Sequence, residues 1–307
     1  MSRLTCRFLW AFSLVSFISI FCISAHAYQV KDSFGKHNID TPPKRVVVTD
    51  WVLLEQMLEL GVTPIGAPEL DLYRHYVRRP ALPDGIRDIG LRNKPSLSIL
   101  RELKPDVIIL GTDQKKLARP FSHIAPVMYY KSFSDKYRTN GKKSRVRFLQ
   151  IADLFQKRQL AEKKLAEMDL ELLNIKKQID TYFNHRPPKV TLIRFSSETK
   201  CLVYGENSIP LYAMKQIGLQ THMLSSRSKW GEQELPIERL AEIETGIIML
   251  VSPIDKQAEM FSSARWQALP AVQQNRVLIM SPVWSYGGAM SVLYNARAMS
   301  QALINGQ

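Results

Sequence analysis

Two stretches of the chain, LSILRELKPDVIIL at residues 97–110 and IERLAEIETGIIML at residues 237–250, repeat one pattern. Aligned without gaps, they share a leucine, a glutamate and two apolar positions: Leu100 and Leu240, Glu102 and Glu242, Ile108 and Ile248, Leu110 and Leu250. Each stretch predicts an amphipathic helix of two to three turns, a tight break (KPD or ETG) and a buried strand. A short helix and a further strand follow each copy, so the sequence predicts two similar α/β lobes.

The residues before the first copy also alternate between strand and helix signals. Residues 45–49 form a β-branched run after a proline pair, and residues 51–60 have apolar residues at helical spacing before Gly61. Another short strand is expected near residues 64–66. Alternation of this kind favours a parallel sheet covered by helices.

A long amphipathic segment separates the two halves. Over residues 144–183 apolar residues recur every three or four positions with no Pro or Gly, which predicts one long helix with a break near 157–159. A coiled-coil helix is the alternative, but the apolar seam is too short for a set of heptads. The predicted organisation is a first lobe at 28–143, a linking helix at 144–184 and a second lobe at 185–307. A ligand is expected in the cleft between the lobes.

Residues 1–27 have the layout of a secretory signal peptide. A short positive start is followed by an uncharged apolar run over 8–24 and by Ala25-His26-Ala27, a small-x-small cleavage site. A membrane anchor is the alternative, and a lipoprotein is disfavoured because Phe21 precedes Cys22. Cleavage leaves Cys201 as the only cysteine, so no internal disulfide is expected.

The chain is basic, with 42 Lys and Arg against 28 Asp and Glu and a net charge of +14. A basic chain can indicate nucleic-acid binding, but an exported protein does not meet chromosomal DNA, and removal of Arg3 and Arg7 leaves +12. The charge then serves an anionic small ligand, an anionic surface, or only the solubility of the protein.

Sequence motifs of catalysis are missing. The chain has no Gly-x-Ser-x-Gly, Walker loop, dinucleotide fingerprint or His-Glu-x-x-His, and its histidines lack metal-ligand spacing. Aromatic and arginine side chains near strand ends are better candidates for a site, because ligands of open α/β sheets lie beyond the carboxyl ends of the strands. These candidates are Trp51, Tyr76, Arg92, Trp230, Trp284 and Tyr286.

Several segments together resemble the ferric-hydroxamate-binding periplasmic proteins of FhuD type. They are DIGLRNKPSL (88–97), ELKPDVIIL (102–110), SKWG (228–231), RWQALPAVQQNRV (265–277) and PVWSYGG (282–288), and the resemblance runs from Lys44 to Ala302. It implies a class III periplasmic binding protein: two α/β lobes joined by one long rigid helix. It also implies a monomeric periplasmic carrier that hands a ferric siderophore to an inner-membrane ABC permease. Such a carrier is not an enzyme, has no covalent cofactor and uses no side chain as a metal ligand.

The resemblance also implies roles for single residues. Arg92 is expected to contact the metal-binding oxygens of the siderophore, and Trp51, Trp230, Trp284 and Tyr76 to form aromatic walls around it. The family's tyrosine after the KPD strand is replaced by Gln114, which can still donate through its amide. A basic neighbourhood suggests a more anionic ligand, such as a citrate-containing hydroxamate: Arg74, Arg78, Arg79, Lys94, Lys115 and Lys116.

Permease docking in the wider class uses an acidic residue early in an equivalent helix of each lobe. In the second lobe this residue is Glu238. In the first lobe the matching position is Ser98, and Glu102 lies one turn later. Two other functions stay open: a haem or cobalamin carrier of the same class, and an exported enzyme with a dispersed His or Cys site.

Overall fold

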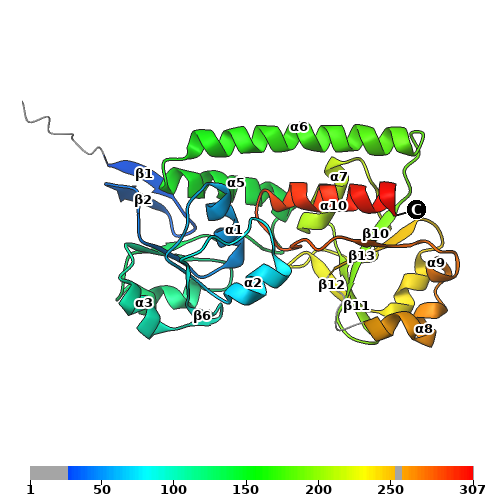
Figure 1. The fold of residues 1–307 in the computed structure, drawn as a ribbon, viewed down its shortest axis with the longest axis horizontal. Helices are drawn as coiled ribbons and strands as arrows, with labels where there is room; N and C mark the ends of the chain where they lie inside the picture. The colour runs from blue at the N-terminus through cyan, green and yellow to red at the C-terminus, as the bar shows by residue number, and fades with distance from the viewer. Residues whose placement is uncertain (1–26, 253–257, 307) are drawn as a thin grey trace, which may run out of the picture.

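The computed structural model describes residues 27–252 and 258–306, which form two α/β lobes lying side by side (Figure 1). Residues 1–26, which hold nearly all of the predicted signal peptide, lie outside the described residues. Within the described part of the chain, no helix is long and apolar enough to cross a membrane.

The first lobe has a five-stranded, wholly parallel sheet in the order β5-β4-β3-β8-β9. Its strands are β3 (Val46–Val48), β4 (Gly66–Ala67), β5 (Arg87–Asp88), β8 (Val107–Leu110) and β9 (Val127–Tyr129). The helices that connect them are α1 (Trp51–Glu59), α2 (Leu70–Tyr76), α3 (Leu97–Leu103), η1 (Lys115–Leu117) and α4 (Ala118–Phe121). Two hairpins, β1 (Tyr28–Lys31) with β2 (Lys36–Ile39) and β6 (Gly90–Leu91) with β7 (Lys94–Pro95), complete the lobe.

The second lobe has a five-stranded mixed sheet in the order β12-β11-β10-β13-β14, in which β10, β13 and β14 are parallel and β11 and β12 antiparallel. Its strands are β10 (Val190–Phe195), β11 (Lys200–Tyr204), β12 (Glu232–Pro236), β13 (Ile247–Val251) and β14 (Val277–Met280). Its helices are α7 (Ile209–Gln216), η2 (Ile237–Glu242), η3 (Ala258–Ser262), α8 (Ala264–Gln267), α9 (Pro270–Gln273) and α10 (Ser291–Asn305). The predicted pair of α/β lobes is therefore confirmed, with an antiparallel edge added to the second sheet.

The two copies of the repeated pattern, residues 97–110 and 237–250, occupy corresponding places in the two lobes. β8 lies beside β3 and β9, and β13 lies beside β10 and β14, in both cases in parallel register. The helices differ, because the first copy is the α-helix α3 and the second is a 3-10 helix, η2, where two to three α-helical turns were expected. Ser96 caps α3 by accepting a hydrogen bond from the Ile99 amide, whereas Pro236 precedes η2 and makes no side-chain cap.

The linking segment contains the predicted long helix and a sharper break than expected. α5 (Asn140–Leu154) ends at a turn over 155–157, and α6 (Arg158–Tyr182) then returns along it. Arg145 pairs with Asp169 at 2.7 Å and Arg158 with Asp153 at 2.8 Å, a pattern that only antiparallel helices allow. α6 alone then runs across both lobes (Figure 1).

A single apolar cluster joins the lobes beneath α6. It includes Val46 and Leu54 of the first lobe, Val190 of the second, Met168 of α6 and Met299 of α10. The buried residues of α6 recur at the predicted spacing: Ala161, Leu165, Met168, Leu172, Ile175 and Ile179. Because packed cores resist deformation, this cluster holds the two lobes in a fixed relation.

Candidate ligand-binding site

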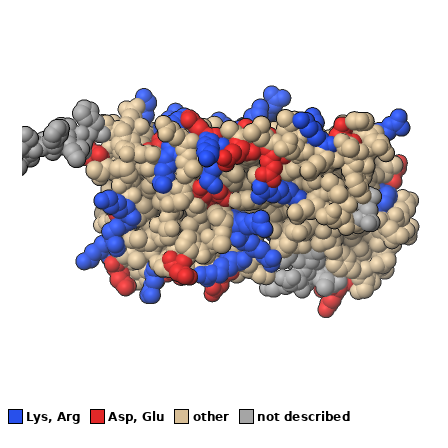
Figure 2. All heavy atoms as spheres, turned by 45° about the horizontal axis from the view of Figure 1, so that its top comes forward, with Lys and Arg blue, Asp and Glu red and all other residues tan. Residues whose placement is uncertain are grey.

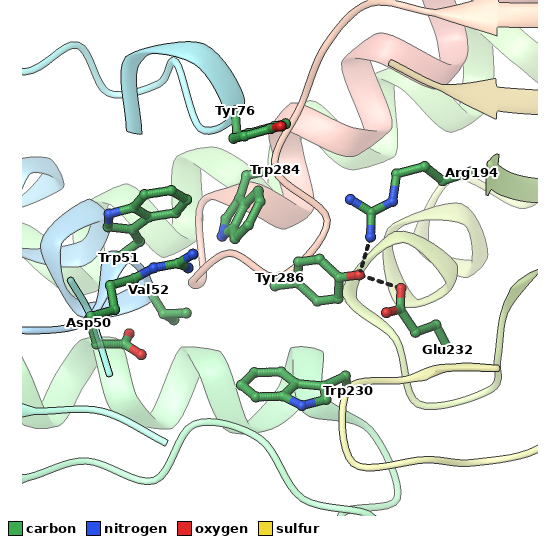
Figure 3. A pocket seen from close by; sticks show the side chains of 10 residues that line it. Asp50, Trp51, Val52, Tyr76, Arg194, Trp230, Glu232, Trp284 and Tyr286 are labelled. Atoms are coloured by element: carbon green, nitrogen blue, oxygen red, sulfur yellow. Dashed lines mark hydrogen bonds between the residues drawn. The ribbon is translucent and has the colours of Figure 1, made fainter. Parts of the chain in front are cut away.

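A cavity of about 420 Å³ lies between the lobes and is lined by residues of both. The first lobe contributes Asp50, Trp51, Val52, Tyr76 and Arg92, and the second contributes Arg194, Trp230, Glu232, Trp284 and Tyr286. In Figure 3 the rings of Tyr76, Trp284, Tyr286 and Trp230 form a wall between Trp51 on one side and Arg194 on the other. Six of the seven predicted ligand-binding residues are brought together here.

The lining residues follow the ends of strands. Trp51 starts α1 just after β3, Arg194 is the penultimate residue of β10, and Trp284 follows β14. The carboxyl ends of the parallel strands in both sheets thus face the cleft, as expected for ligand sites in open α/β sheets.

The aromatic wall is held by edge-to-face contacts. The ring centroids of Trp51 and Trp284 lie 5.5 Å apart, those of Trp284 and Tyr286 5.1 Å, and those of Trp230 and Tyr286 6.1 Å, with angles of 67°, 71° and 85° between the ring planes. The indole Nε1 of Trp51 donates to the carbonyl oxygen of Pro68 at 2.9 Å, and this hydrogen bond fixes the Trp51 ring at the edge of the cavity. These contacts add to the stability gained from burying the rings, so the wall is preformed.

Arg92 is oriented by three contacts. Its guanidinium lies 3.6 Å from the centroid of the Trp51 ring, and its Nε donates to the carboxylate of Glu69. Its backbone carbonyl accepts a hydrogen bond of 2.7 Å from Gln114. The side chain stays partly exposed to the cleft and can offer its remaining N–H donors to a ligand.

Gln114 does not line the cavity, and its expected contact with the ligand is corrected by the structure. The side chain is buried, and its Oε1 accepts from the Gly111 amide at 2.7 Å and from the Thr49 hydroxyl at 2.6 Å. Its Nε2 donates to the carbonyl oxygens of Thr49 and Arg92. Since every polar atom of the amide already has a partner, Gln114 supports Arg92 from beneath.

Arg194, Tyr286 and Glu232 form a hydrogen-bonded chain at the opposite end of the cavity (Figure 3). Arg194 Nη2 donates to the Tyr286 hydroxyl at 2.8 Å, and that hydroxyl donates to the Glu232 carboxylate. Burial raises the pKa of Glu232, and Tyr286 and Arg194 oppose this shift. Arg194 Nε is buried and makes no hydrogen bond within the described residues, so the donors that remain for a ligand are those of its terminal nitrogens.

The lining carries two arginines and two carboxyl groups, so its formal charges cancel. Burial raises the pKa of Asp50 to about 6, while its cap to the Leu53 amide and the nearby Arg92 lower it. The predicted basic neighbourhood lies outside the cavity: Arg74 pairs with Asp71 at 2.9 Å, and Arg78 donates to the His75 carbonyl. The structure therefore does not support the expectation that these charges face the ligand.

No cysteine or histidine of the described residues lines this cavity, although the His75 ring packs on the lining residue Tyr76 at 4.6 Å. Cys201 is buried in β11, and desolvation raises the pKa of its thiol to about 12, so it stays a thiol. No group of three or more His, Cys, Asp or Glu side chains that could hold a metal ion occurs in the described ranges 27–252 and 258–306.

The two predicted docking residues lie on the surface and outside the cavity. Glu102 is exposed on α3, and Glu238 is exposed on η2, where it pairs with Arg265 of α8. α3 and α8 both lie on the side of the molecule opposite α6 (Figure 1).

Sequence reasoning missed Asp50, Val52, Arg194 and Glu232 as lining residues. Arg194 carried a signal, because it is the only charged residue of an otherwise apolar or neutral strand, VTLIRF, at its carboxyl end. Glu232 directly follows the SKWG loop that was already a candidate. Neither signal reveals the hydrogen bonds through Tyr286, because the partners are far apart in sequence.

Known proteins share the two-lobed fold of this chain. The family model for periplasmic binding protein matches residues 46–283. The siderophore-binding protein FhuD from Vibrio cholerae, solved with Fe3+–Desferal bound, is 37% identical, with a TM-score of 0.82, covering 85% of this chain and 98% of its own. The iron(3+)-hydroxamate-binding protein FhuD of Escherichia coli K12 is 27% identical over 274 residues, covering 87% of this chain and 89% of its own. The Fe(3+)-citrate-binding protein YfmC of Bacillus subtilis is 24% identical over 251 residues, covering 81% of this chain and 76% of its own. With its two lobes, spanning helix and aromatic cleft, the chain belongs to the periplasmic binding protein family and, within it, to the FhuD-type siderophore-binding proteins.

Proposed function

We propose that this protein captures ferric hydroxamate siderophores in the cavity between its lobes and delivers them to an inner-membrane ABC permease. As a member of a family of substrate-binding transport proteins, the chain is a carrier and not an enzyme. The proposed ligand class rests on one observation: an aromatic cavity whose two arginines and two carboxyl groups balance in charge.

Charge balance favours hydroxamates over the other iron chelates that relatives bind. Three hydroxamate groups each carry one negative charge, so they cancel the charge of Fe3+ and leave a neutral core. A ferric triscatecholate carries three negative charges and would need an excess of cations in the site. The names of two relatives, with Fe3+–Desferal and iron(3+)-hydroxamate as ligands, point the same way.

The geometry suggests how the ligand is held. A ferric hydroxamate has an apolar backbone around partly negative oxygens, and the rings of Trp230, Trp284 and Tyr286 can cover that backbone. Arg92 can donate charge-assisted hydrogen bonds to the chelating oxygens. Arg194 offers a second donor from the other lobe. The iron arrives already chelated, so this binding requires no protein side chain as a metal ligand.

Delivery completes the proposed role. An exported carrier is expected in the periplasm after cleavage of the segment 1–27, and Glu238 and Glu102 are the proposed contacts with permease arginines. The two residues belong to different lobes. A permease that contacts both must therefore match the fixed distance between the lobes.

Tryptophan fluorescence tests the ligand class directly, because three tryptophans line the cavity. Titration with ferric trihydroxamates should quench the emission at sub-micromolar to micromolar concentrations. Ferric citrate, a ferric triscatecholate, haem and cobalamin complete the panel. Trp284→Phe should remove part of the quenching. Trp266 is buried in the second lobe and does not line the cavity, so Trp266→Phe should leave the quenching unchanged. Quenching by haem or cobalamin but not by hydroxamates would refute the proposal.

A further inference from the structure

Glu55 is a carboxyl group buried between the lobes that the binding mechanism above does not use. It lies on α1, about one turn beyond Trp51, and has no exposed surface. Its two carboxyl oxygens lie 2.8 and 2.9 Å from the Ser291 hydroxyl, and one of them accepts a hydrogen bond of 3.1 Å from the Gly288 amide. Both donors belong to the second lobe, so this first-lobe residue holds the segment that leads into α10.

Two glycines let that segment lie against α1. A Cβ atom at Gly287 would lie 1.7 Å from the Ser291 hydroxyl and 2.5 Å from Glu55 Oε2, and one at Gly288 would lie 2.4 Å from Gln56 Cγ. Contacts this short do not occur in folded proteins. The Gly-Gly pair is thus explained by the close approach of the segment to Glu55 and Gln56.

The segment held in this way is the loop that carries Trp284 and Tyr286. Within its own lobe the loop is fixed by Asn295 Nδ2, which donates to the Trp284 carbonyl at 3.2 Å, by the Tyr204 hydroxyl, which donates to Ser285 at 2.8 Å, and by the hydrogen bonds of Tyr286 with Arg194 and Glu232. Glu55 adds hydrogen bonds that come from α1, the element that carries Trp51.

We propose that Glu55 is a positioning residue for ligand binding, which fixes the Trp284–Tyr286 loop of the second lobe against the Trp51 helix of the first. The proposal rests on the proposed function and extends it to the residue that assembles the aromatic wall. The contact between the Trp51 and Trp284 rings, 5.5 Å apart, is the feature that Glu55 maintains.

Burial between the lobes favours the protonated form of the Glu55 carboxyl group. Desolvation raises its pKa to about 8, while the Gly288 amide and Ser291 hydroxyl lower it and the nearby Glu59 raises it. The other ionisable groups around this region are Tyr73 of α2, Tyr294 of α10, and Lys164 of α6, which pairs with Glu59 at 2.9 Å. A glutamine has nearly the shape of a protonated glutamate and, like it, offers both a donor and an acceptor, so Glu55→Gln should preserve the attachment and Glu55→Ala should lose it.

The test measures affinity for a ferric trihydroxamate in folded protein. Glu55→Ala should raise the dissociation constant roughly tenfold, the effect of losing about one net hydrogen bond, and Glu55→Gln should stay within about twofold of the wild type. Met299→Ala is the matched control, because Met299 is buried on α10 two turns beyond Ser291. It should lower the melting temperature without changing affinity, so a purely structural role for Glu55 would make the two alanine variants behave alike.

A second readout needs no ligand. With 5-fluorotryptophan incorporated, the 19F resonance assigned through Trp284→Phe should shift or broaden in Glu55→Ala and keep its position in Glu55→Gln. If Glu55→Ala does not fold, Ser291→Ala, which removes the hydroxyl donor, takes its place in both assays. If the wild-type protein does not bind ferric hydroxamates, the proposed function is refuted. The 19F signal of Trp284 still tests the attachment of its loop by Glu55 in that case. Wild-type affinity and an unmoved Trp284 signal in the alanine variant refute the role of Glu55.

Discussion

Arg92 and Arg194 face the same cavity but are held in different ways. Arg92 lies over the Trp51 ring and pairs with Glu69 on its first-lobe side. Arg194 comes from within a strand and is tied to Glu232 through the Tyr286 hydroxyl. Each guanidinium thus has a carboxylate nearby before a ligand arrives: Glu232 of the lining for Arg194, and Glu69, outside the lining, for Arg92. The cavity can therefore offer directed donors without a net positive charge.

Arg92→Ala should weaken ferric hydroxamate binding by about 10- to 100-fold, the loss of a hydrogen bond to a charged group. The expected loss also includes the stacking of the guanidinium on Trp51. Arg74→Ala is the control, since Arg74 is exposed, pairs with Asp71 of its own helix and does not line the cavity. Isothermal titration of both variants measures the effect, and unchanged affinity in Arg92→Ala would remove Arg92 from the site.

Glu55 gives stability a defined dependence on pH. Its pKa is about 8 in the folded protein and near 4.5 in the unfolded chain, so the folded state binds the extra proton between these values. The contribution of Glu55 to the free energy of unfolding should therefore be largest below about pH 4.5 and should fall as the pH rises towards 8. Urea unfolding at pH 5, 6, 7 and 8 should show this fall in the wild type and a shallower one in Glu55→Gln. Parallel curves would contradict the raised pKa.

At the scale of elements, the loop before β12 depends on a glycine that no other residue can replace. Gly231 has φ +81°, and a Cβ there would lie 2.5 Å from the Ser208 Cα at the start of α7. Gly231→Ala should cost about 2–4 kcal/mol of stability, from backbone strain together with the clash. It should also weaken ligand binding, because Trp230 is the preceding residue.

Gly85 provides the matched control for this effect. Its φ is +85°, almost the same as that of Gly231, but a Cβ there would meet nothing within 4 Å. Gly85→Ala should cost about 1 kcal/mol from strain alone and leave affinity unchanged. Equal losses of stability and of affinity in the two variants, measured by urea unfolding and fluorescence titration, would show that the contact with Ser208 plays no part.

Strands were predictable where a continuous apolar run is buried on both faces. Val46–Val48, Val107–Leu110 and Ile247–Val251 all lie within or close to the expected runs, because parallel sheets covered by helices require such residues. The edge strand Val277–Met280 was also expected, although Ile279 is 52% exposed. The reversal between α5 and α6 was predicted only as a break. Its direction is fixed by pairs such as Arg145 with Asp169, which are formed only once the helices pack.

The site was predictable where the type and position of a single residue are unusual for a structural role. Tryptophans and an arginine in loops after strands are unusual enough to indicate a ligand, and all of these predicted residues line the cavity. Gln114 was expected in contact with ligand because its place in the chain matches a family tyrosine. Its shorter side chain instead turns inward and satisfies the Gly111 amide and Thr49. Glu55 gave no signal, because its partners lie more than 230 residues away.

At the scale of the whole molecule, the positive charge is dispersed. Figure 2 turns the α6 side forward and shows Lys and Arg interspersed with Asp and Glu on that face. Exposed pairs such as Arg158 with Glu162 and Lys163 with Glu167 account for part of this pattern. Mixed charges of this kind keep a protein soluble. They do not form the continuous basic patch that would recognise an anionic surface on this face.

The shared core and the attachment of Glu55 to Ser291 indicate that the lobes move little relative to each other. Stiffness matters for delivery, because a permease that contacts both lobes would then meet its two docking residues at a fixed separation. Glu102 and Glu238 are both exposed, one on each lobe. Glu238 is paired with Arg265 in the free protein, and since both side chains are about half exposed, solvent screens the pair and a permease arginine can replace Arg265 with little penalty.

Glu238→Lys and Glu102→Lys should therefore each reduce siderophore-dependent iron uptake in cells with the matching permease, and the double variant should nearly abolish it. Ligand affinity in solution should stay at the wild-type value, because neither residue lines the cavity. Glu167→Lys on α6 is the control of equal charge change on the opposite side of the molecule, and it should leave uptake intact. Equal losses in all three single variants would assign the effect to overall charge, and normal uptake in the double variant would place the permease on another surface.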